Sequence, residues 1–236
     1  MTEYLGLPLS VRDNPRARRV LVKLIPGKGL QVVVPRGFDP GRVAGILASK
    51  RSWIERTRAV LEADGADLTG RIPDLPDEAA FRATGRTCRV DYLDRPGRTT
   101  VIENGPSILV RGPKDDPAAL LDGLVRFTTA KAREFLLPRL DEASRRLDMP
   151  YSALRVRRQR TRWGSCSARG VISLNAKLLF LPPELVDHLL LHELCHTRHL
   201  NHSAQYWALV ASHQPDFARL EKALNRGIAD VPRWFA

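Results

Sequence analysis

The chain has 236 residues, with 38 Lys and Arg against 26 Asp and Glu, which gives a formal net charge of +12. Its hydrophobic share of 43% and charged share of 27% are typical of an ordinary folded protein. No apolar run approaches the roughly 18 residues of a membrane-spanning helix, so we expect no transmembrane helix and no membrane partner.

The cysteines and the start of the chain bear on location. The sequence begins with neither the basic nor the apolar segment of a signal peptide. The three cysteines are odd in number and have no C-x-x-C spacing, which favours reduced thiols over disulfides. We therefore expect a cytoplasmic protein.

The first third of the chain is predicted to hold a hairpin followed by a helix. Apolar segments at 19–25 and 30–34 flank a Pro-Gly-Lys-Gly turn, a pattern typical of two antiparallel strands. A helix is then expected from Asp39-Pro40 to about Glu62, with Trp53 and Ile54 on its apolar side.

The middle of the chain alternates between strands and a long helix. A proline-rich connector at 73–77 precedes strands expected near 81–93, 99–103 and 107–110. Asp116-Pro117 is a helix start, and that helix is predicted to run to about Leu147. We therefore expect a β-rich N-terminal subdomain over residues 1–115 and a second subdomain over residues 116–236.

The C-terminal subdomain is predicted to place two strands before a histidine-rich helix. The strands are expected at 154–162 and 171–174, and a last helix at about 215–225. Pro182-Pro183-Glu184 gives start signals for the helix between them, which contains an apolar run. The fold class is α+β.

All six histidines lie between His188 and His213, and the centre of this segment is the motif H-E-x-x-H at residues 192–196. Residues i and i+4 of a helix share one face, so His192 and His196 can direct their imidazoles at one point. A catalytic Zn²⁺ takes three protein ligands and keeps one position for water. The motif predicts one zinc ion per chain, with one ligand from outside the helix.

The third ligand is assigned to His202, with His199 as the competing ligand. The spacing of His192, His196 and His202 matches the metzincin pattern, although that pattern has Gly where this chain has His199. His202 follows the expected end of the helix, so the chain can turn it back onto the ion. His199 would form a row with the helical pair instead of a third corner.

Glu193 is the predicted general base. It lies about 100° round the helix from His192, where it can reach water at the metal but is poorly placed as a ligand. A second donor to the oxyanion is expected, and Tyr206, His199 and Arg198 are the candidates nearby in sequence.

The remaining polar residues of this region are predicted to be structural. His188 and His213 fit solvated or hydrogen-bonded side chains, and Cys195 fits a small buried residue. Ser165 and Cys166 have no base partner apparent in the sequence, so neither is predicted to be a nucleophile.

A basic stretch leads into the metal motif. Residues 149–183 contain no acid and seven Lys or Arg residues, which predicts an electropositive approach to the site. Such a surface favours an acidic partner or nucleic acid. General basicity explains the stretch equally well, and alternation along a strand would split these arginines between two faces.

Motifs on both sides of the histidines resemble one family. They are R-W-G-S-C-S from Arg162, I-S-L-N from Ile172, L-P-P from Leu181, H-E-L-C-H from His192 and N-H-S-x-x-Y-W from Asn201. Together they resemble the YgjP-like metallopeptidases, relatives of the SprT-like zincins. The resemblance implies a zincin-like fold with His192, His196 and His202 as ligands and Glu193 as catalytic residue. It also implies a protein or peptide substrate, with Trp163–Asn175 supplying either a sheet edge for that substrate or the wall of the cleft. Residues 163–166 fit a tight structural turn that supports the site as an alternative.

The predicted activity is peptide-bond hydrolysis by a zinc metallopeptidase. One alternative is a ribonuclease that uses three histidines at this spacing, but we expect that class to lack the glutamate after the first histidine. The other is a zinc-stabilised nucleic-acid-binding or scaffold protein without turnover.

Overall fold

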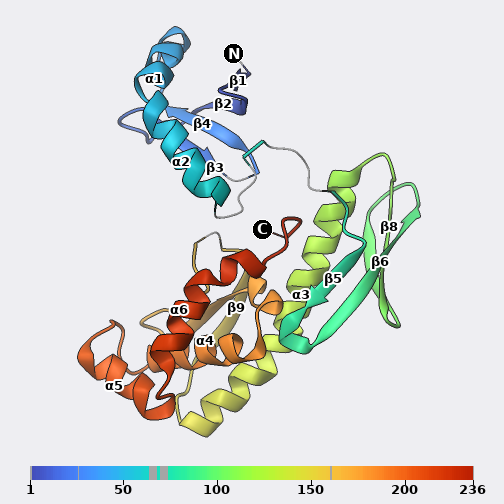
Figure 1. The fold of residues 1–236 in the computed structure, drawn as a ribbon, viewed down its shortest axis with the longest axis vertical. Coiled ribbons are helices and arrows are strands. Elements are labelled where there is room, and N and C mark those ends of the chain that lie inside the picture. Colours follow the sequence, from blue (N-terminus) through green and yellow to red (C-terminus); the bar gives the residue numbers. More distant parts are fainter. Residues whose placement is uncertain (1, 26, 64–67, 70–73, 160, 236) are drawn as a thin grey trace. The chain divides into compact units, whose positions relative to one another are not determined.

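The computed structural model describes residues 2–25, 27–63, 68–69, 74–159 and 161–235. Contacts within the chain divide it into two compact units, Met1–Pro73 and Asp74–Ala236 (Figure 1). The mixed architecture and the β-rich first half agree with the predicted α+β class.

The first unit is a four-stranded sheet with helices, in the strand order β1-β2-β4-β3. Its strands are β1 (Glu3–Tyr4), β2 (Leu7–Asp13), β3 (Leu21–Ile25) and β4 (Gly29–Val34). The predicted hairpin is confirmed, because β3 and β4 pair antiparallel; Pro26 of its turn lies outside the described residues. The β1 and β2 strands were not predicted, and β2 runs parallel to β4.

The helix predicted over residues 39–62 is divided in the structure. It consists of η1 (Pro40–Arg42), α1 (Val43–Ser49) and α2 (Arg51–Ala63), with a break at Lys50. Of the two residues expected on its apolar side, Ile54 is fully buried and Trp53 is 38% exposed. Ile54 packs in a core with Leu7, Leu30 and Leu47.

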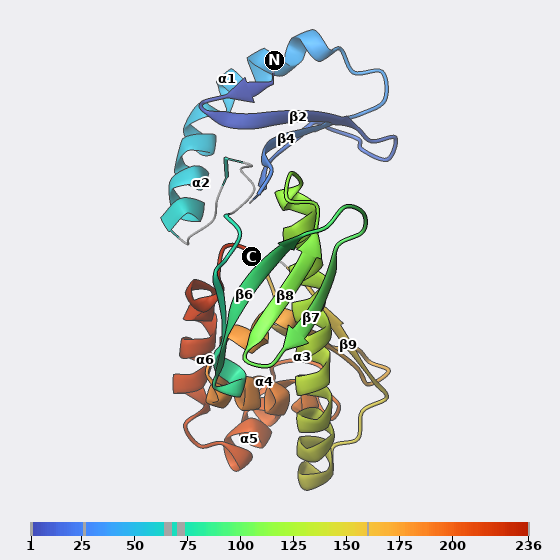
Figure 2. The ribbon, with the colours of Figure 1, turned by 90° about the vertical axis from the view of Figure 1, so that its right-hand side faces the viewer.

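The second unit begins with another four-stranded sheet, in the order β5-β6-β8-β7. Its strands are β5 (Glu78–Phe81), β6 (Arg86–Asp94), β7 (Thr100–Asn104) and β8 (Ser107–Gly112), and η2 (Arg82–Thr84) follows β5. Strands β6 and β8 are parallel neighbours, and the sheet packs on helix α3 (Pro117–Leu147), as Figure 2 shows. Of the predicted connector at 73–77, Pro73 is not described and residues 74–77 contain no helix or strand.

Helix α3 agrees with the sequence prediction at both ends. Asp116 is its N-cap and accepts a hydrogen bond from the Ala119 amide. The helix shares one core with the sheet, because Leu120 and Leu124 pack in the same cluster as Ile108 and Val110 of β8. This shared core explains why the contacts divide the chain after residue 73 and not at the expected boundary between residues 115 and 116.

A three-stranded sheet follows α3, in the order β10-β11-β9. Strand β9 (Ala153–Arg157) ends before the predicted residue 162, and β11 (Val171–Asn175) pairs parallel to it. Strand β10 (Gly164–Cys166) was not predicted as a strand, and it pairs antiparallel with β11 at the edge of this sheet. The predicted substrate segment, Trp163–Asn175, therefore contains this edge strand and the central strand β11.

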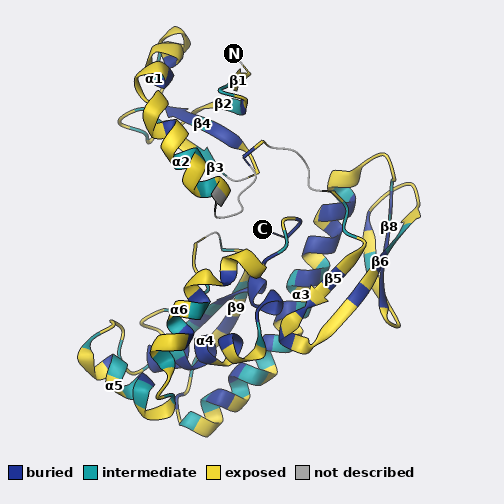
Figure 3. Ribbon diagram, in the orientation of Figure 1, coloured by how far each residue is buried: buried dark blue, intermediate teal, exposed yellow. Residues whose placement is uncertain are grey.

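Helices complete the second unit. They are η3 (Ala176–Phe180), α4 (Pro183–Cys195), α5 (Ala204–His213), α6 (Phe217–Arg226) and η4 (Gly227–Asp230). The α4 and α6 helices were predicted, whereas α5 was not. Helix α4 is largely buried (Figure 3). It is joined to α3 by an exposed ion pair, in which Arg139 contacts both carboxylate oxygens of Asp187 at 2.7 and 2.9 Å. No helix in the described part of the chain is long and apolar enough to cross a membrane.

Candidate metal centre

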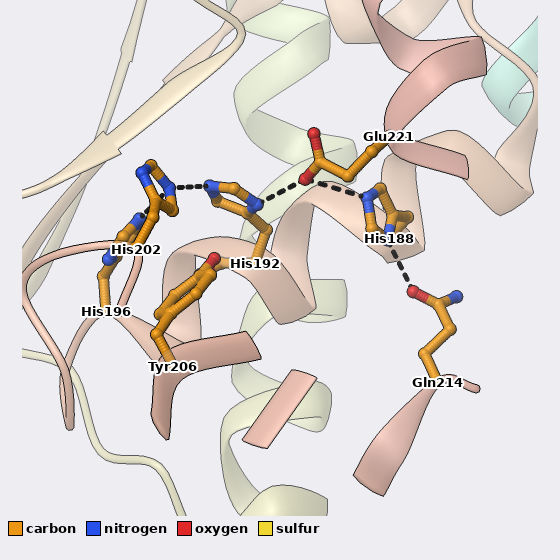
Figure 4. Close-up of polar contacts among 7 residues, drawn as sticks. All are labelled: His188, His192, His196, His202, Tyr206, Gln214 and Glu221. Carbon is orange, nitrogen blue, oxygen red and sulfur yellow. Dashed lines mark hydrogen bonds and ion pairs between the residues drawn. The ribbon is translucent and has the colours of Figure 1, made fainter. Parts of the chain in front are cut away.

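The centre is built on the last turns of helix α4. Pro183 occupies the first turn of this helix, and buried leucines hold it in the core. His192 and His196 are one turn apart, and the chain turns after His196 so that His202 returns to them (Figure 4). The Nε2 atom of His202 lies 3.2 Å from Nε2 of His192 and 3.2 Å from Nε2 of His196.

The spacing of these nitrogens fits a tetrahedral metal ion. Zinc–nitrogen bonds of about 2.0–2.1 Å at a tetrahedral angle place two ligand nitrogens about 3.3 Å apart. Among the described residues, two groups of His, Cys, Asp or Glu are close enough to hold an ion. One is His192, His196 and His202, and the other is His188, His192 and Glu221; neither contains His199.

The outer nitrogens of the helical pair have acceptors that determine the tautomer. His196 Nδ1 lies 2.9 Å from the carbonyl oxygen of His199, and His192 Nδ1 lies 2.7 Å from Oε1 of Glu221. A carbonyl and a carboxylate accept hydrogen bonds, so each Nδ1 carries the hydrogen and each Nε2 presents a lone pair. The two lone pairs are directed toward Nε2 of His202, and a cation at this point would be bound by them.

Burial keeps two of the imidazoles neutral. Desolvation lowers the pKa of His196, although the His199 carbonyl opposes the shift, and it also lowers the pKa of His202. Neighbouring imidazoles lower both values further. Neutral imidazole is the form that binds metal.

Aromatic rings hold His202 in place from beyond the helix. Its imidazole stacks on Trp207 with centroids 5.4 Å apart and planes 19° apart, and Trp207 stacks in turn on Phe217. Trp207 of α5 and Phe217 of α6 therefore form a column of stacked rings behind His202, the ligand that lies in a loop. Without this column, an exposed loop histidine would lose rotamer freedom when it binds an ion.

Tyr206 supports the helical pair from α5. The fully buried ring stacks on His196 at 4.5 Å, and its hydroxyl donates to the carbonyl oxygen of His192 at 3.1 Å. Burial raises the pKa of Tyr206, so it remains a neutral donor. The hydroxyl nominated as an oxyanion donor thus has a backbone partner in this structure.

Glu193 is buried beside the imidazoles. Its side chain is 2% exposed, and its Oε2 has no hydrogen-bond partner among the described residues. Burial, followed by the charge of Glu221, raises the pKa of Glu193 to about 8. A carboxyl group in this environment changes protonation near neutral pH.

The R-W-G-S-C-S and I-S-L-N motifs form the wall against which Glu193 lies. A Cβ on Gly164 of β10 would be 2.8 Å from Cδ of Glu193, so only glycine leaves room for the carboxylate. Asn175 of β11 fixes the segment before this glycine, because its amide nitrogen donates at 2.8 Å to the carbonyls of Gln159 and Arg162. Sequence reasoning named these motifs without giving either residue a role.

Glu221 of α6 was also missed by sequence reasoning. Its Oε1 accepts hydrogen bonds from both His192 and His188, and these bonds outweigh its burial and lower its pKa to about 2. One signal existed in the sequence. Glu221 occupies the same stripe as Phe217 and Leu224, at the margin of the apolar face of an amphipathic helix.

The other nominated residues lie around this centre with partners of their own. Arg198 is exposed and donates to the backbone carbonyl of Asp148 at 2.7 Å. His199 contributes its backbone carbonyl to His196. His188 is fully buried and hydrogen-bonded, whereas His213 is exposed.

The cysteines near the site are poor nucleophiles. Cys195 is fully buried as expected, and burial raises its pKa to about 11. Burial, followed by the charge of Glu193, also raises the pKa of Cys166 to about 11. Neither thiol is therefore ionised at neutral pH.

The basic stretch places two of its arginines on one face. Arg155 and Arg157 alternate with less exposed residues along β9, and both are exposed. Arg158 instead lies over the Phe235 ring at 5.3 Å, and Arg160 lies outside the described residues. The stretch is thus divided between different partners, as the predicted strand alternation implies.

One comparison with known proteins identifies a family for most of the chain. The family model described as YgjP-like, metallopeptidase domain, matches residues 18–227. A search of curated proteins finds no match.

Two solved structures are similar over part of the chain. The metallopeptidase zymogen abylysin of Pyrococcus abyssi is 24% identical, with 38% of this chain and 91% of that chain covered and a TM-score of 0.35. The metallopeptidase zymogen jannalysin of Methanocaldococcus jannaschii is 18% identical, with 38% and 92% covered and a TM-score of 0.34. Both TM-scores are below 0.5, so neither likeness establishes a shared fold.

Proposed function

Because the chain belongs to the YgjP-like family of metallopeptidases, we propose that it hydrolyses peptide bonds at the centre on α4. The main support is the convergence of three imidazole Nε2 atoms beside a buried glutamate. We assign His192, His196 and His202 as ligands of one Zn²⁺ per chain. Glu193 is the general base.

The donor set favours zinc over harder metals. Imidazole nitrogens suit Zn²⁺ better than Mg²⁺ or Ca²⁺, which prefer oxygen ligands. When bound, the ion supplies Lewis acidity, which polarises a peptide carbonyl and acidifies water. The three imidazoles are neutral and do not cancel the charge of the ion, which leaves that acidity at full strength.

Glu193 moves the proton. Its carboxylate takes a proton from the water that attacks the scissile carbonyl and passes it to the leaving amine. Burial raises the pKa of this carboxyl to about 8 in the metal-free chain, and a cation bound by the neighbouring imidazoles would favour the ionised form that accepts the proton. Gly164 positions this carboxylate, since any side chain there would displace it.

The substrate aligns along β10. This strand lies at the edge of its sheet, and Gly164 at its start contacts Glu193. A peptide that adds as a further strand would gain main-chain hydrogen bonds and bring a peptide bond past the carboxylate. This geometry supports a protein or peptide substrate.

We also assign a zincin-like arrangement to the second unit. Three features support it: a sheet whose edge strand precedes the site, a helix with H-E-x-x-H, and a third ligand supplied after that helix. The side chains of Tyr206 and Arg198 donate to backbone carbonyls, and His199 contributes its own carbonyl to His196. We therefore give them supporting positions around the ligands and assign none as the second oxyanion donor.

Metal analysis of the purified full chain tests the ligand set. We expect one zinc per chain in the wild type and in His199→Ala, and loss of zinc in His202→Ala. Loss in His199→Ala with retention in His202→Ala would replace the third ligand.

Turnover tests the base and separates the alternative activities. Glu193→Gln should retain zinc and lose about 10²–10⁴-fold in casein hydrolysis, the range that general-base catalysis supplies. Structured RNA is assayed beside casein with the same zinc-loaded protein. Cleavage of RNA alone, or full peptidase activity in Glu193→Gln, would overturn the proposed function.

A further inference from the structure

The carboxylate of Glu221 joins the metal centre to a fourth histidine. Its Oε1 lies 2.7 Å from Nδ1 of His192 and 3.2 Å from Nε2 of His188 (Figure 4). On the far side of the second ring, His188 Nδ1 lies 2.5 Å from Oε1 of Gln214. An unbroken chain of polar contacts therefore connects Gln214 with the ligand His192.

Glu221 determines which nitrogen of His192 faces the ion. An imidazole with one hydrogen can carry it on either nitrogen, and a hydrogen on Nε2 would block metal binding. The ionised carboxylate accepts from Nδ1, so the hydrogen stays there and the Nε2 lone pair remains directed at His202. A negative acceptor also makes the imidazole a stronger donor to a metal.

His188 holds the carboxylate in place. Its side chain is fully buried, and both of its ring nitrogens have a partner. The amide of Gln214 can present either its oxygen or its nitrogen to the ring, so these contacts do not require a charged His188. With the ring locked on both sides, Oε1 of Glu221 cannot swing away from His192 without breaking a buried hydrogen bond.

The same three groups are close enough to be considered as a second metal site, but the distances favour hydrogen bonds. Two ligands of one tetrahedral ion are about 3.3 Å apart, whereas His192 Nδ1 and Glu221 Oε1 are only 2.7 Å apart. That separation is a normal charge-assisted hydrogen bond.

We propose that Glu221 is a positioning residue for the metal centre, with His188 and Gln214 as its support. The inference rests on the proposed function, because it takes His192 to be a ligand. In this arrangement α4 presents three histidines at successive turns, His188, His192 and His196. The last two bind the ion, and the first binds the carboxylate that orients the second.

Zinc affinity of the full chain, measured by competition with a chromophoric chelator, tests the proposal. Glu221→Gln keeps the side-chain volume and removes the charge, so we expect zinc to bind about 10–100-fold more weakly. Glu221→Asp keeps the charge and should recover part of the affinity. Glu184→Gln, at an exposed position of α4, is the matched control and should bind as the wild type does.

The visible spectrum of the Co²⁺-loaded protein gives a second readout. It reports ligand geometry, so we expect it to change in Glu221→Gln and to return toward the wild-type form in Glu221→Asp. A purely structural role would lower the stability of metal-free and zinc-loaded protein equally and leave affinity and spectrum unchanged.

Different results would refute the positioning role of Glu221 and the proposed peptidase function. Affinity within twofold of wild type in Glu221→Gln would overturn the positioning role and leave the peptidase intact. A wild-type protein that binds no zinc would instead overturn the proposed function. If Glu221→Gln does not fold, Glu221→Ala replaces it, because it also removes the carboxylate, and zinc affinity within twofold of the wild type in that variant would overturn the positioning role.

Discussion

Glu193→Gln should change how the stability of the metal-free protein depends on pH. In the folded chain, burial raises the pKa of this carboxyl from 4.5 to about 8. Between these values the folded state holds a proton that the unfolded state has released. The stability of the wild type therefore falls as pH rises from 4.5 to 8, and the glutamine variant lacks this loss.

The magnitude follows from the two pKa values. Each pH unit in this window changes the free energy of unfolding by about 1.4 kcal/mol, and little change remains outside it. From pH 5 to pH 8 the wild type should lose about 3–4 kcal/mol relative to Glu193→Gln. Because the side chain is 2% exposed, solvent screening reduces this figure little. The amide of glutamine has its own burial cost, but that cost does not vary with pH.

Urea unfolding at pH 5, 6, 7 and 8 in the presence of a chelator measures the effect. Three of the four tryptophans lie in the second unit, so tryptophan fluorescence reports chiefly on the unit that contains Glu193. Glu184→Gln is the control for the same chemical change at an exposed position of α4. Parallel curves for wild type and Glu193→Gln over this range would refute the argument that burial perturbs Glu193.

Three further substitutions test the surroundings of the site. Gly164→Ala should displace Glu193 and reduce kcat/KM about 100-fold or more while zinc content stays near one per chain; unchanged activity would contradict the contact. Tyr206→Phe removes the hydrogen bond to the carbonyl of His192 and should lower the free energy of unfolding by about 0.5–1.5 kcal/mol, measured by denaturant unfolding. A larger decrease would contradict the assignment of this single hydrogen bond as the role of the hydroxyl. Trp207→Leu removes the ring stacked on His202 and should weaken zinc binding severalfold in a chelator competition. Wild-type affinity would show that the stacking does not contribute to zinc binding.

The elements that sequence predicted well have local causes. Helix α3 follows from the start signal Asp116-Pro117, and the β3–β4 hairpin follows from a Pro-Gly turn between apolar runs. Strand β10 was missed because three residues of W-G-S-C carry no alternation, and it exists by pairing with β11. The boundary after residue 73 depends on the packing of α3 against the β5–β8 sheet that precedes it, and local sequence patterns do not encode such tertiary contacts.

The candidate site also combines features that local sequence predicts with features that depend on tertiary packing. The proximity of His192, His196 and His202 was predictable, because helical spacing and one turn bring them together within eleven residues. Glu221 and Asn175 were not predictable as partners of the site, because each reaches it through tertiary packing. Single polar residues of this kind occur on many helices and strands, and only the folded arrangement assigns them a partner.

The short separation of the three imidazoles has a consequence for the unfolded chain. Closing a loop of ten residues costs little entropy, so these side chains can meet around an ion before the rest of the unit folds. A ligand that also binds the unfolded state stabilises the native state by less than its native affinity implies. Glu221 is nineteen residues further along and belongs to α6, so its contact with His192 is one part of the centre that requires the fold. This carboxylate therefore increases the difference in zinc affinity between the folded and the unfolded chain. That difference determines how much zinc stabilises the folded state.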